Sequence, residues 1–261
     1  MQNLLELKGK VALVTGAGQG VGRQVALDFA DHGCAAVIVN DFYAERAQAV
    51  ADEVARRGSK GVVVAGDVTN FEFMMKAVPE AAVAAGGLHI CVNNAGNAGT
   101  SGDTGAPAFW ESDRADWDRW LGTNLFGVLN VSRAAIPLMI KSGGGSLINV
   151  VSDAGRVGEP GLAVYSAAKA GAAGLARALA KSLGVHNVRV NSVSLATIMT
   201  PTIAPLLEDE EARKKMLRHY IVRRVGQPSD ASAMILFLAS NASSWITGQT
   251  FGVNGGYSTS Q

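Results

Sequence analysis

Three side chains, those of Ser152, Tyr165 and Lys169, could together move a proton on and off an alcohol. Tyr165 and Lys169 are four residues apart in an alanine- and glycine-rich stretch expected to be helical, and residues at this spacing share one helix face. A phenol normally titrates at a pKa of about 10, and a neighbouring ammonium group favours its ionised form. The hydroxyl of Ser152 could hold a substrate oxygen beside the phenol, completing an acid–base centre. Because tyrosine and lysine also meet at this spacing by chance, the rest of the chain must decide.

Length and composition are typical of a globular protein with a sizeable core. The chain has 261 residues, of which 48% are hydrophobic and 17% charged. Its formal net charge of +1 gives no reason to expect nucleic acid or an anionic membrane as a partner. Cys34 and Cys91 stand in or beside apolar runs, as buried cysteines of a reducing compartment do. Because the sequence shows neither a signal peptide nor an uncharged apolar run of membrane-spanning length, we expect a cytoplasmic protein.

Apolar runs and amphipathic stretches alternate along the chain. Strands are predicted at 11–14, 35–40, 61–65, 89–92, 146–151, 188–193 and 249–253, and helices at 23–32, 45–57, 71–85, 124–141, 165–183 and 229–240. Apolar strands that alternate with helices are typical of a parallel sheet covered on both faces. The sequence therefore predicts an α/β fold: one Rossmann-type domain over residues 1–261 with a doubly wound, seven-stranded parallel sheet.

A glycine-rich turn follows the first predicted strand and opens the first helix. Gly16, Gly20 and Gly22 are spaced Gly-x-x-x-Gly-x-Gly, and glycines at such a turn let the backbone approach a pyrophosphate closely. The free N–H groups at the start of the helix favour the same anion. The turn therefore predicts a dinucleotide site, with Gln19 and Val21 beside the glycines.

Asp41, just past the second predicted strand, indicates which dinucleotide binds. A carboxylate at this position accepts hydrogen bonds from the adenosine ribose hydroxyls and would repel a 2′-phosphate. Neither Gln19 nor Phe42 offers a cation for that phosphate. NAD is therefore favoured over NADP, unless Asp41 merely begins a turn.

With these features together, the chain resembles the short-chain dehydrogenase/reductase (SDR) family from about Leu7 to Tyr257. Ser152 and Tyr165 are separated by thirteen residues, as the family pattern expects, and the motifs stand in the family's order. The motifs are Thr15-Gly16-x-x-x-Gly20-x-Gly22, Asp67-Val68, Asn93-Asn94-Ala95-Gly96, Asn124, Ser152, Tyr165-x-x-x-Lys169 and Arg189-Val190-Asn191.

The resemblance implies a role for each matching position. Tyr165 would be the catalytic acid/base, Lys169 would hold the nicotinamide ribose and lower the pKa of Tyr165, and Ser152 would orient the substrate oxygen. Asn124 would interrupt its helix and bind a water that passes protons to solvent. The implied catalytic residues are Ser152, Tyr165, Lys169 and Asn124, and the implied cofactor-binding residues are Gly16, Gln19, Gly20, Val21, Gly22, Asp41, Phe42, Asp67, Val68, Asn94, Ala95, Gly96, Tyr165, Lys169, Ile198 and Thr200, with no metal site.

One segment departs from the family pattern. After the sixth predicted strand the family usually has Pro-Gly, whereas this chain has Leu195 and Ala196. These residues lack the fixed φ of proline and the freedom of glycine at positive φ, so the loop is expected to follow a different path. Ile198 and Thr200 still match the positions that contact the nicotinamide carboxamide, and we expect activity to survive.

The acid–base centre fixes the reaction, the interconversion of a secondary alcohol and a ketone, but not the substrate. Substrate walls are expected from residues 97–110 and 195–224, which follow strands at the edge where ligands bind in open parallel sheets. Ser152 to Gly158 resembles the segment of family members that oxidise hydroxyacyl-CoA thioesters, and Arg156 with the basic stretch Arg213 to Arg218 could face such a carrier. Alicyclic, steroid and terpenoid alcohols remain equally open. Arg156 as a surface residue, and the basic stretch as a solvated helix, are the simpler alternatives.

Two other functions compete with this interpretation. An NADPH-dependent reductase of 3-oxoacyl-(acyl carrier protein) would have the same catalytic residues, but Asp41 argues against it. A cofactor-sensing protein without turnover would typically lose Tyr165 or Lys169, and this chain keeps both. The resemblance also implies a homotetramer or homodimer built partly on the helix that follows Tyr165.

Overall fold

One parallel sheet organises the computed structural model, which describes residues 3–97 and 107–259 apart from the side chain of Leu206. Within these residues, seven strands pair in the order β3-β2-β1-β4-β5-β6-β7. The strands are β1 (Val11–Val14), β2 (Ala36–Asp41), β3 (Lys60–Ala65), β4 (Ile90–Asn93), β5 (Gly145–Ser152), β6 (Val188–Leu195) and β7 (Thr250–Val253). The strand order reverses between β1 and β4, which is the point where open α/β sheets bind ligands. The predicted fold class is confirmed.

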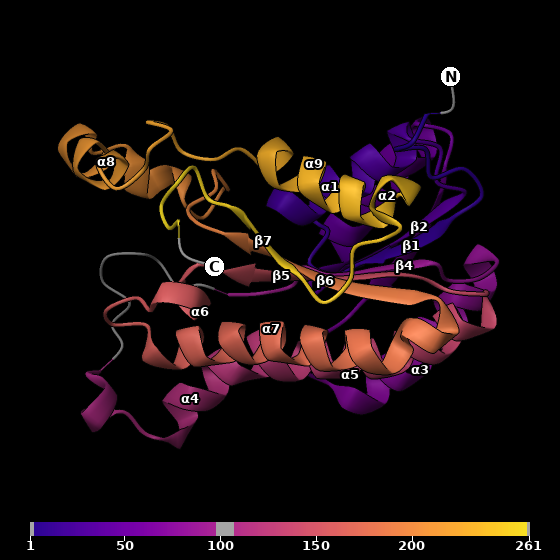
Figure 1. Ribbon diagram of the computed structural model, residues 1–261, viewed down its shortest axis with the longest axis horizontal. Coiled ribbons are helices and arrows are strands. Elements are labelled where there is room, and N and C mark those ends of the chain that lie inside the picture. Colours follow the sequence, from indigo (N-terminus) through magenta and orange to yellow (C-terminus); the bar gives the residue numbers. More distant parts are fainter. Residues whose placement is uncertain (1–2, 98–106, 260–261) are drawn as a thin grey trace.

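Helices cover both faces of the sheet, and each face has its own core. Figure 1 shows α1 (Gly20–Asp31), α2 (Ala44–Arg56) and α9 (Pro228–Ala239) on one side, and α3 (Phe71–Ala85), α5 (Gly127–Lys141) and α7 (Ala163–Leu183) on the other. Successive residues of a strand point to opposite faces. Accordingly, Ala12 and Val14 of β1 join the core under α1 and α9, and Val11 and Leu13 join the core of the opposite face. This two-sided burial explains why the strands read as continuous apolar runs.

The register brings the ends of three strands level. Ser152 at the end of β5 pairs with Leu195 at the end of β6, which pairs with Val253 at the end of β7. The strand β6 thus continues through Leu195, two residues beyond its predicted end. Loops from all three strands therefore begin at the same edge of the sheet as Tyr165, at the start of α7.

Smaller elements fill the segments between the main helices. A capping box closed by Asp113 begins α4 (Arg114–Leu121), and a π-helix, η2 (Gly122–Phe126), joins it to α5. The remaining short elements are α6 (Ala154–Val157), α8 (Glu210–Leu217) and the 3₁₀ helices η1 (Phe109–Glu111), η3 (Gly184–His186), η4 (Ala204–Leu207) and η5 (Asn241–Ser243).

The continuous helical stretch Arg114–Lys141 meets the length and composition criteria of a membrane span. Half of its most apolar window is nevertheless buried inside the protein, and α5 lies in the layer that covers the sheet. Core helices pass the same criteria, so the stretch gives no argument for a membrane.

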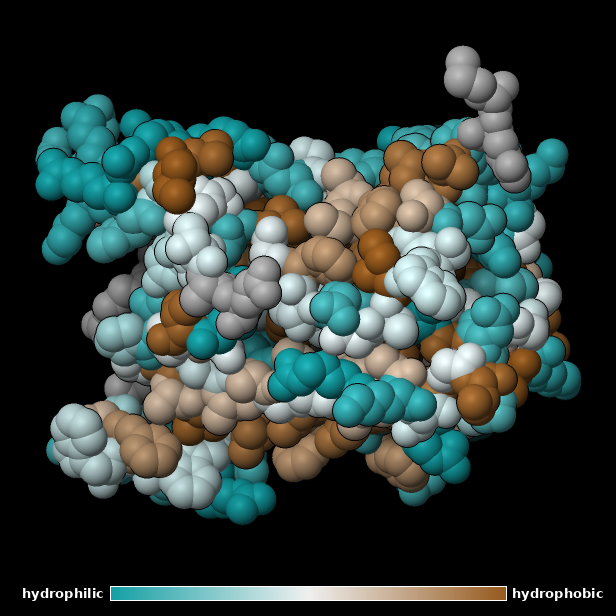
Figure 2. Space-filling view, viewed as in Figure 1, coloured by the Kyte–Doolittle hydropathy of each residue, from teal (hydrophilic) through white to brown (hydrophobic). Residues whose placement is uncertain are grey.

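The predicted strands and helices lie within three residues of their predicted ends, with the largest shifts at the starts of α1 and α5. The helix α4 was not predicted, and α1 begins at Gly20 rather than Arg23. Residues 98–106, most of the first expected substrate wall, lie outside the described residues. The charged pattern after Glu208 forms α8, which contains no buried residue, and Figure 2 shows hydrophilic residues gathered over it.

Candidate functional site

Ser152, Tyr165 and Lys169 lie together at the carboxyl end of the sheet. Tyr165 and Lys169 are both buried on α7, with the Lys169 Nζ 5.8 Å from the centre of the Tyr165 ring. The same Nζ donates a hydrogen bond to the Val150 carbonyl at 3.1 Å, which ties α7 to β5. The Ser152 and Tyr165 hydroxyls are hydrogen-bonded to each other. The structure therefore brings together the phenol, ammonium and hydroxyl groups that the spacing predicted.

Burial dominates the electrostatics of this centre. It raises the pKa of Tyr165, and the hydrogen bond with Ser152 offsets only part of that effect. Burial also lowers the pKa of Lys169 from 10.5 to about 8. The net shift of the Tyr165 pKa is therefore upward in the protein without cofactor, because desolvation of the phenolate outweighs the hydrogen bond with Ser152, and the expected lowering by Lys169 stays a prediction.

Asn124 lies at the centre of the π-helix η2 and is completely buried. Its Nδ2 donates to the Trp120 carbonyl at 2.9 Å, and also to the backbone and side-chain oxygens of Asn97 at 2.9 and 2.6 Å. The Asn97 N–H donates back to Asn124 Oδ1 at 3.2 Å, and Asn97 Nδ2 donates to the Arg119 carbonyl. The helix interruption expected at Asn124 is present, and Asn97 is a partner that the sequence did not reveal.

Two further residues enclose the centre. The ring of Trp120 meets that of Tyr165 edge-on, with centroids 5.8 Å apart. A Cβ placed on Gly96 would lie 2.9 Å from Asn124 Oδ1 and 3.1 Å from Lys169 Nζ. Only glycine fits there without moving these polar atoms, which explains the requirement at Gly96. Trp120 was not predicted, because its helix α4 was not.

The glycine turn has the close packing that a pyrophosphate cradle needs. Gly16 and Gly20 have φ angles of 60° and 56°, which favour glycine. A Cβ on Gly22 would lie 2.3 Å from the Gly16 carbonyl oxygen, so no side chain fits. Asn94 fastens the turn to β4, because its Nδ2 donates to the carbonyls of Thr15 and Gly16 at 2.9 and 3.1 Å. The turn therefore leaves the backbone at the start of α1 uncovered by side chains. Gln19 is the N-cap of this helix, and Val21 is buried.

Asp41, at the end of β2, faces the same turn. Its Oδ2 accepts the Gly18 N–H at 2.9 Å, and its Oδ1 accepts the Tyr43 N–H at 3.0 Å. A Cβ on Gly18 would lie 2.6 Å from both Asp41 Oδ2 and the Arg46 Cβ. Arg46 therefore starts beside the carboxylate, and its guanidinium stacks over the Tyr43 ring at 4.4 Å. Arg46, in the first turn of α2, is thus a cation near Asp41 that the sequence pattern at Gln19 and Phe42 did not indicate.

The other expected cofactor positions lie on several different elements. Thr200 reaches the turn, since its methyl group lies 3.2 Å from a Cβ placed on Gly20. Ile198 is buried and bridges to Gly226. Asp67 and Val68 follow β3, where the Asp67 carboxylate accepts the Thr69 N–H at 2.8 Å. Phe42 is exposed, and Ala95 packs against the turn at Gly16.

Comparison with known proteins assigns the family. A family model described as enoyl-(acyl carrier protein) reductase matches residues 16–258. Over 252 residues, 97% of this chain and 95% of the relative, the chain is 35% identical to 7alpha-hydroxysteroid dehydrogenase of Escherichia coli. The chain belongs to the short-chain dehydrogenase/reductase family. Membership makes this SDR protein an oxidoreductase that interconverts alcohols and ketones.

Other SDR relatives have different substrates by name. The chain is 36% identical to 3-oxoacyl-[acyl-carrier-protein] reductase FabG of Thermotoga maritima, with 97% of this chain and 99% of the relative covered. It is 35% identical to cyclohexanol dehydrogenase of Acinetobacter sp., with 97% of each chain covered. A solved 7alpha-hydroxysteroid dehydrogenase complexed with NADH and 7-oxo glycochenodeoxycholic acid superposes with a TM-score of 0.89 at 35% identity, covering 98% of both chains.

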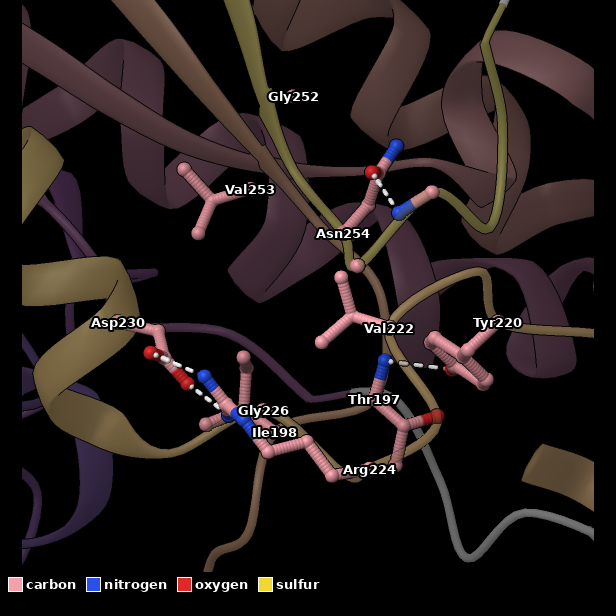
Figure 3. Close-up of a pocket in the computed structure, with 12 residues that line it drawn as sticks. Thr197, Ile198, Tyr220, Val222, Arg224, Gly226, Asp230, Gly252, Val253 and Asn254 are labelled. Atoms are coloured by element: carbon pink, nitrogen blue, oxygen red, sulfur yellow. Dashed lines mark hydrogen bonds and ion pairs between the residues drawn. The ribbon is translucent and has the colours of Figure 1, made fainter.

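One cavity of this SDR protein lies under the loop that follows β6. It measures about 340 Å³ and is lined by Thr197, Ile198, Tyr220, Val222, Arg224, Gly226, Asp230 and residues 252–256. Figure 3 shows the Tyr220 hydroxyl accepting the Thr197 N–H, and the Arg224 guanidinium paired with Asp230. None of the four residues expected to be catalytic lines it. Part of the expected wall 195–224 is thus hollowed on the side of β7.

Arg156 does not face an open carrier site. Its side chain is 18% exposed and its Nη1 lies 3.1 Å from the Asp153 carboxylate. A Cβ on Gly252 would lie 3.1 Å from the same nitrogen, so the guanidinium lies against β7. The proposed contact of Arg156 with the phosphates of a CoA thioester is therefore not supported by its position.

Proposed function

We propose that this protein is an NAD-dependent dehydrogenase of secondary alcohols, with Tyr165 as the acid/base. The observation that carries the proposal is the buried Tyr165 hydroxyl, hydrogen-bonded to Ser152 and lying near the Lys169 ammonium. A phenol in this setting can accept the proton of an alcohol whose oxygen is held by Ser152, and can return it when a ketone is reduced. Lys169 and Asn124 complete the proposed catalytic set, and residues 1–261 act as one domain.

The residues expected to bind the cofactor fit a dinucleotide. The glycine turn, in which no side chain fits at Gly22, and the free N–H groups at the start of α1 suit a pyrophosphate. When bound, the nicotinamide supplies the hydride chemistry. The proposed contacts are the residues named above from the glycine turn, Asp41 and Phe42, Asp67 and Val68, Asn94 to Gly96, Ile198 and Thr200.

The protein itself would handle the proton. Tyr165 takes the hydroxyl proton of the alcohol, and its raised pKa in the free protein means that a positive charge nearby is needed to ionise it. Lys169 supplies part of that charge, since a pKa of about 8 leaves it mostly protonated at neutral pH. Trp120 and the π-helix shield the phenol from solvent on one side.

The preference for NAD rests on Asp41. Its carboxylate is held by two backbone N–H groups beside Gly18, where it would meet the ribose hydroxyls of the adenosine. Arg46 begins next to it and weakens the repulsion of a 2′-phosphate, so NADP should bind less tightly but measurably.

We propose an alicyclic or steroid alcohol as the substrate. The relatives named as 7alpha-hydroxysteroid and cyclohexanol dehydrogenases support this class. The pairing of Arg156 with Asp153 makes a CoA thioester the weaker alternative. Reduction of 3-oxoacyl chains on a carrier protein is the second candidate, supported by the Thermotoga relative and by Arg46 beside the ribose site.

We also propose a cytoplasmic homotetramer or homodimer. The helix α5, beside α7, carries the exposed apolar residue Leu129, and Phe126 is exposed just before it. Apolar side chains on neighbouring exposed positions are typical of surfaces buried between subunits. Analytical ultracentrifugation would measure the assembly directly.

Steady-state assays with NAD and NADP over cyclohexanol, a 7-hydroxysteroid and a 3-hydroxyacyl thioester test the function. Turnover of an alicyclic or steroid alcohol with NAD is expected, and preferential turnover of the thioester with NADP would favour the second candidate. Tyr165→Phe should reduce turnover by about 10²–10⁴-fold while NADH binding, followed by fluorescence, is retained. Unchanged turnover in this variant would contradict the proposed role of Tyr165.

A further inference from the structure

Asp153, the residue after Ser152, is a buried carboxylate that accepts four side-chain hydrogen bonds. Its Oδ1 accepts from the Ser194 hydroxyl at 2.6 Å and from Arg156 Nη1 at 3.1 Å. Its Oδ2 accepts from Asn254 Nδ2 at 2.6 Å and from the Ser258 hydroxyl at 2.9 Å. Asp153 is only 1% exposed. Two donors on each oxygen match the acceptor capacity of an ionised carboxylate.

The four donors come from three separate parts of the chain. Arg156 lies on α6, Ser194 lies near the end of β6, and Asn254 and Ser258 lie in the segment after β7. Burying a carboxylate is costly unless it is fully hydrogen-bonded, so each donor matters to keeping the charge in place. Asp153 therefore fastens residues 254–258, which we call the C-terminal segment, onto the residue beside Ser152.

The Asp153 side chain is not what holds Ser152. The Asp153 N–H donates to the Leu195 carbonyl at 2.9 Å, and the Ala154 N–H donates to the Ser152 hydroxyl at 3.2 Å. These are backbone donors, which remain when the carboxylate is changed. The carboxylate thus serves the C-terminal segment and not the proton-transfer group.

A second set of contacts joins this segment to the residues that follow α6 and α8. The Tyr257 hydroxyl donates to Glu159 Oε2 at 2.7 Å, and its ring lies 5.5 Å from that of Tyr220. A shallow depression open to solvent lies there, lined by Val157, His219, Tyr257, Ser258 and Thr259. Figure 1 shows the yellow stretch that follows β7 running between α8 and the strand β5. This depression offers a surface for one end of a small-molecule ligand.

We propose that Asp153 is a positioning residue that holds the C-terminal segment as a wall of the substrate site, and that this wall contacts the end of a multi-ring alcohol farthest from the reacting carbon. The inference rests on the proposed alcohol dehydrogenase function. The lining suits such a ligand, because the Val157 side chain and the Tyr257 ring offer apolar contact while Ser258, Thr259 and His219 offer hydrogen bonds. A one-ring alcohol would not reach this wall.

Two variants and a control test the inference. Asp153→Asn removes the charge and replaces one acceptor oxygen by an NH2 group, so one pair of hydrogen bonds is lost. Ser258→Ala is the milder change, because it removes one donor and keeps the buried charge. Asp28→Asn is the matched control, since Asp28 on α1 is another carboxylate that accepts side-chain hydrogen bonds, from Gln24 and Ser232 on the face covered by α1 and α9.

Hydrogen exchange of the cofactor-free protein measures the fastening without any turnover. Amides of residues 254–259 should exchange at least about tenfold faster in Asp153→Asn and severalfold faster in Ser258→Ala, as expected for the loss of about 1 kcal/mol or more of local stability. Asp28→Asn should leave this segment unchanged. Unchanged exchange in both site variants, or equal acceleration in the control, would overturn the role of Asp153.

Kinetics then test the wall. In Asp153→Asn and Ser258→Ala, KM for a steroid alcohol should rise about tenfold and about threefold, with a smaller change in kcat, whereas KM for cyclohexanol should change by less than about twofold. Equal losses for both alcohols, or a loss confined to kcat, would refute the substrate wall. If the wild-type protein oxidised no alcohol, the proposed function would fail, and the exchange experiment would still decide whether Asp153 fastens the segment.

Discussion

Lys169 is a cationic side chain that the fold buries almost completely, and its burial has a measurable cost in stability. Only 5% of the residue is exposed, and burial lowers its pKa from 10.5 to about 8. Because one pKa unit corresponds to about 1.4 kcal/mol, the folded state disfavours the ammonium form by about 3 kcal/mol. Lys169→Met, which keeps the length of the side chain without its charge, should therefore be more stable than the wild type at neutral pH.

The gain should depend on pH in one direction. Below about pH 8 the folded and unfolded states both carry the ammonium, so the whole cost is present. Between about pH 8 and 10.5 the folded state has released its proton and the unfolded state has not, so the wild type recovers stability as pH rises. The stability difference between variant and wild type should thus be largest near neutral pH and should decline towards pH 10.5.

Urea unfolding of the cofactor-free proteins, followed by far-ultraviolet circular dichroism at several pH values, measures this difference. We expect Lys169→Met to be more stable at pH 7 by about 1–3 kcal/mol. The gain is smaller than the full cost of burying the ammonium, because the Val150 carbonyl loses its hydrogen-bond donor in the variant. Turnover should fall by about 10²–10⁴-fold in the same variant. Lys181→Met, at an exposed position of the same helix, is the control and should show no such pH dependence. A stability difference that is the same at pH 7 and pH 10 would refute the reasoning.

Three further predictions follow from the described contacts. Asp41→Ala should lower the ratio of kcat/KM for NAD to that for NADP by at least about tenfold, because the carboxylate is lost while Arg46 remains nearby. An unchanged ratio would show that Asp41 does not select the cofactor. Burial and the nearby Lys10 lower the pKa of His89 below 6.5, and the neutral Nδ1 accepts the Val11 N–H. The contribution of His89 to stability should therefore be present above pH 6.5 and lost as pH falls towards the lowered pKa. Urea unfolding at pH 7.5 and 5.5 measures this dependence, and His89→Asn should weaken it. Asn97→Ala removes the side-chain oxygen that accepts from Asn124 Nδ2 at 2.6 Å, while the backbone contacts between the two residues remain. The variant should lower kcat about tenfold with little change in KM for NAD. A normal kcat would show that the backbone contacts alone order Asn124.

The sheet and its main helices were predictable because their signals are local. A strand buried on both faces reads as a continuous apolar run, and a glycine turn between strand and helix is visible over eight residues, 15–22. The helix α4 was not predicted because Arg114–Leu121 is mostly charged and aromatic, so it lacks a clear apolar face. The capping box of Asp113 and Asp116 stabilises its start. The start of α1 at Gly20 was missed because glycine is a poor helix former and the contacts that hold it there come from elsewhere.

The candidate site was predictable only where its residues are close in sequence or belong to a recognised motif. Ser152, Tyr165 and Lys169 lie within eighteen residues, 152–169, and the structure brings them together. Asp153 meets Ser194, Asn254 and Ser258, which are 41, 101 and 105 residues away, and no local pattern announces such contacts. Arg156, which the sequence left as a carrier contact or a surface residue, pairs with Asp153 only three residues away, and what the sequence does not give here is the burial of Asp153. The direction of the Tyr165 pKa depends on burial, which spacing alone does not give.

The π-helix at Gly122–Phe126 also says something about how this helix can change in evolution. Each residue of an α-helix turns the chain by about 100°, so a π-turn is in effect one extra residue accommodated in a regular helix. Deleting a residue such as Thr123 would restore an ordinary helix but rotate α4 by that angle relative to α5. Trp120 would then leave the Tyr165 ring, and Asn124 would lose the register that lets its amide meet Asn97. Single-residue insertions and deletions should therefore be far less tolerated at 122–126 than substitutions of exposed side chains in the same stretch.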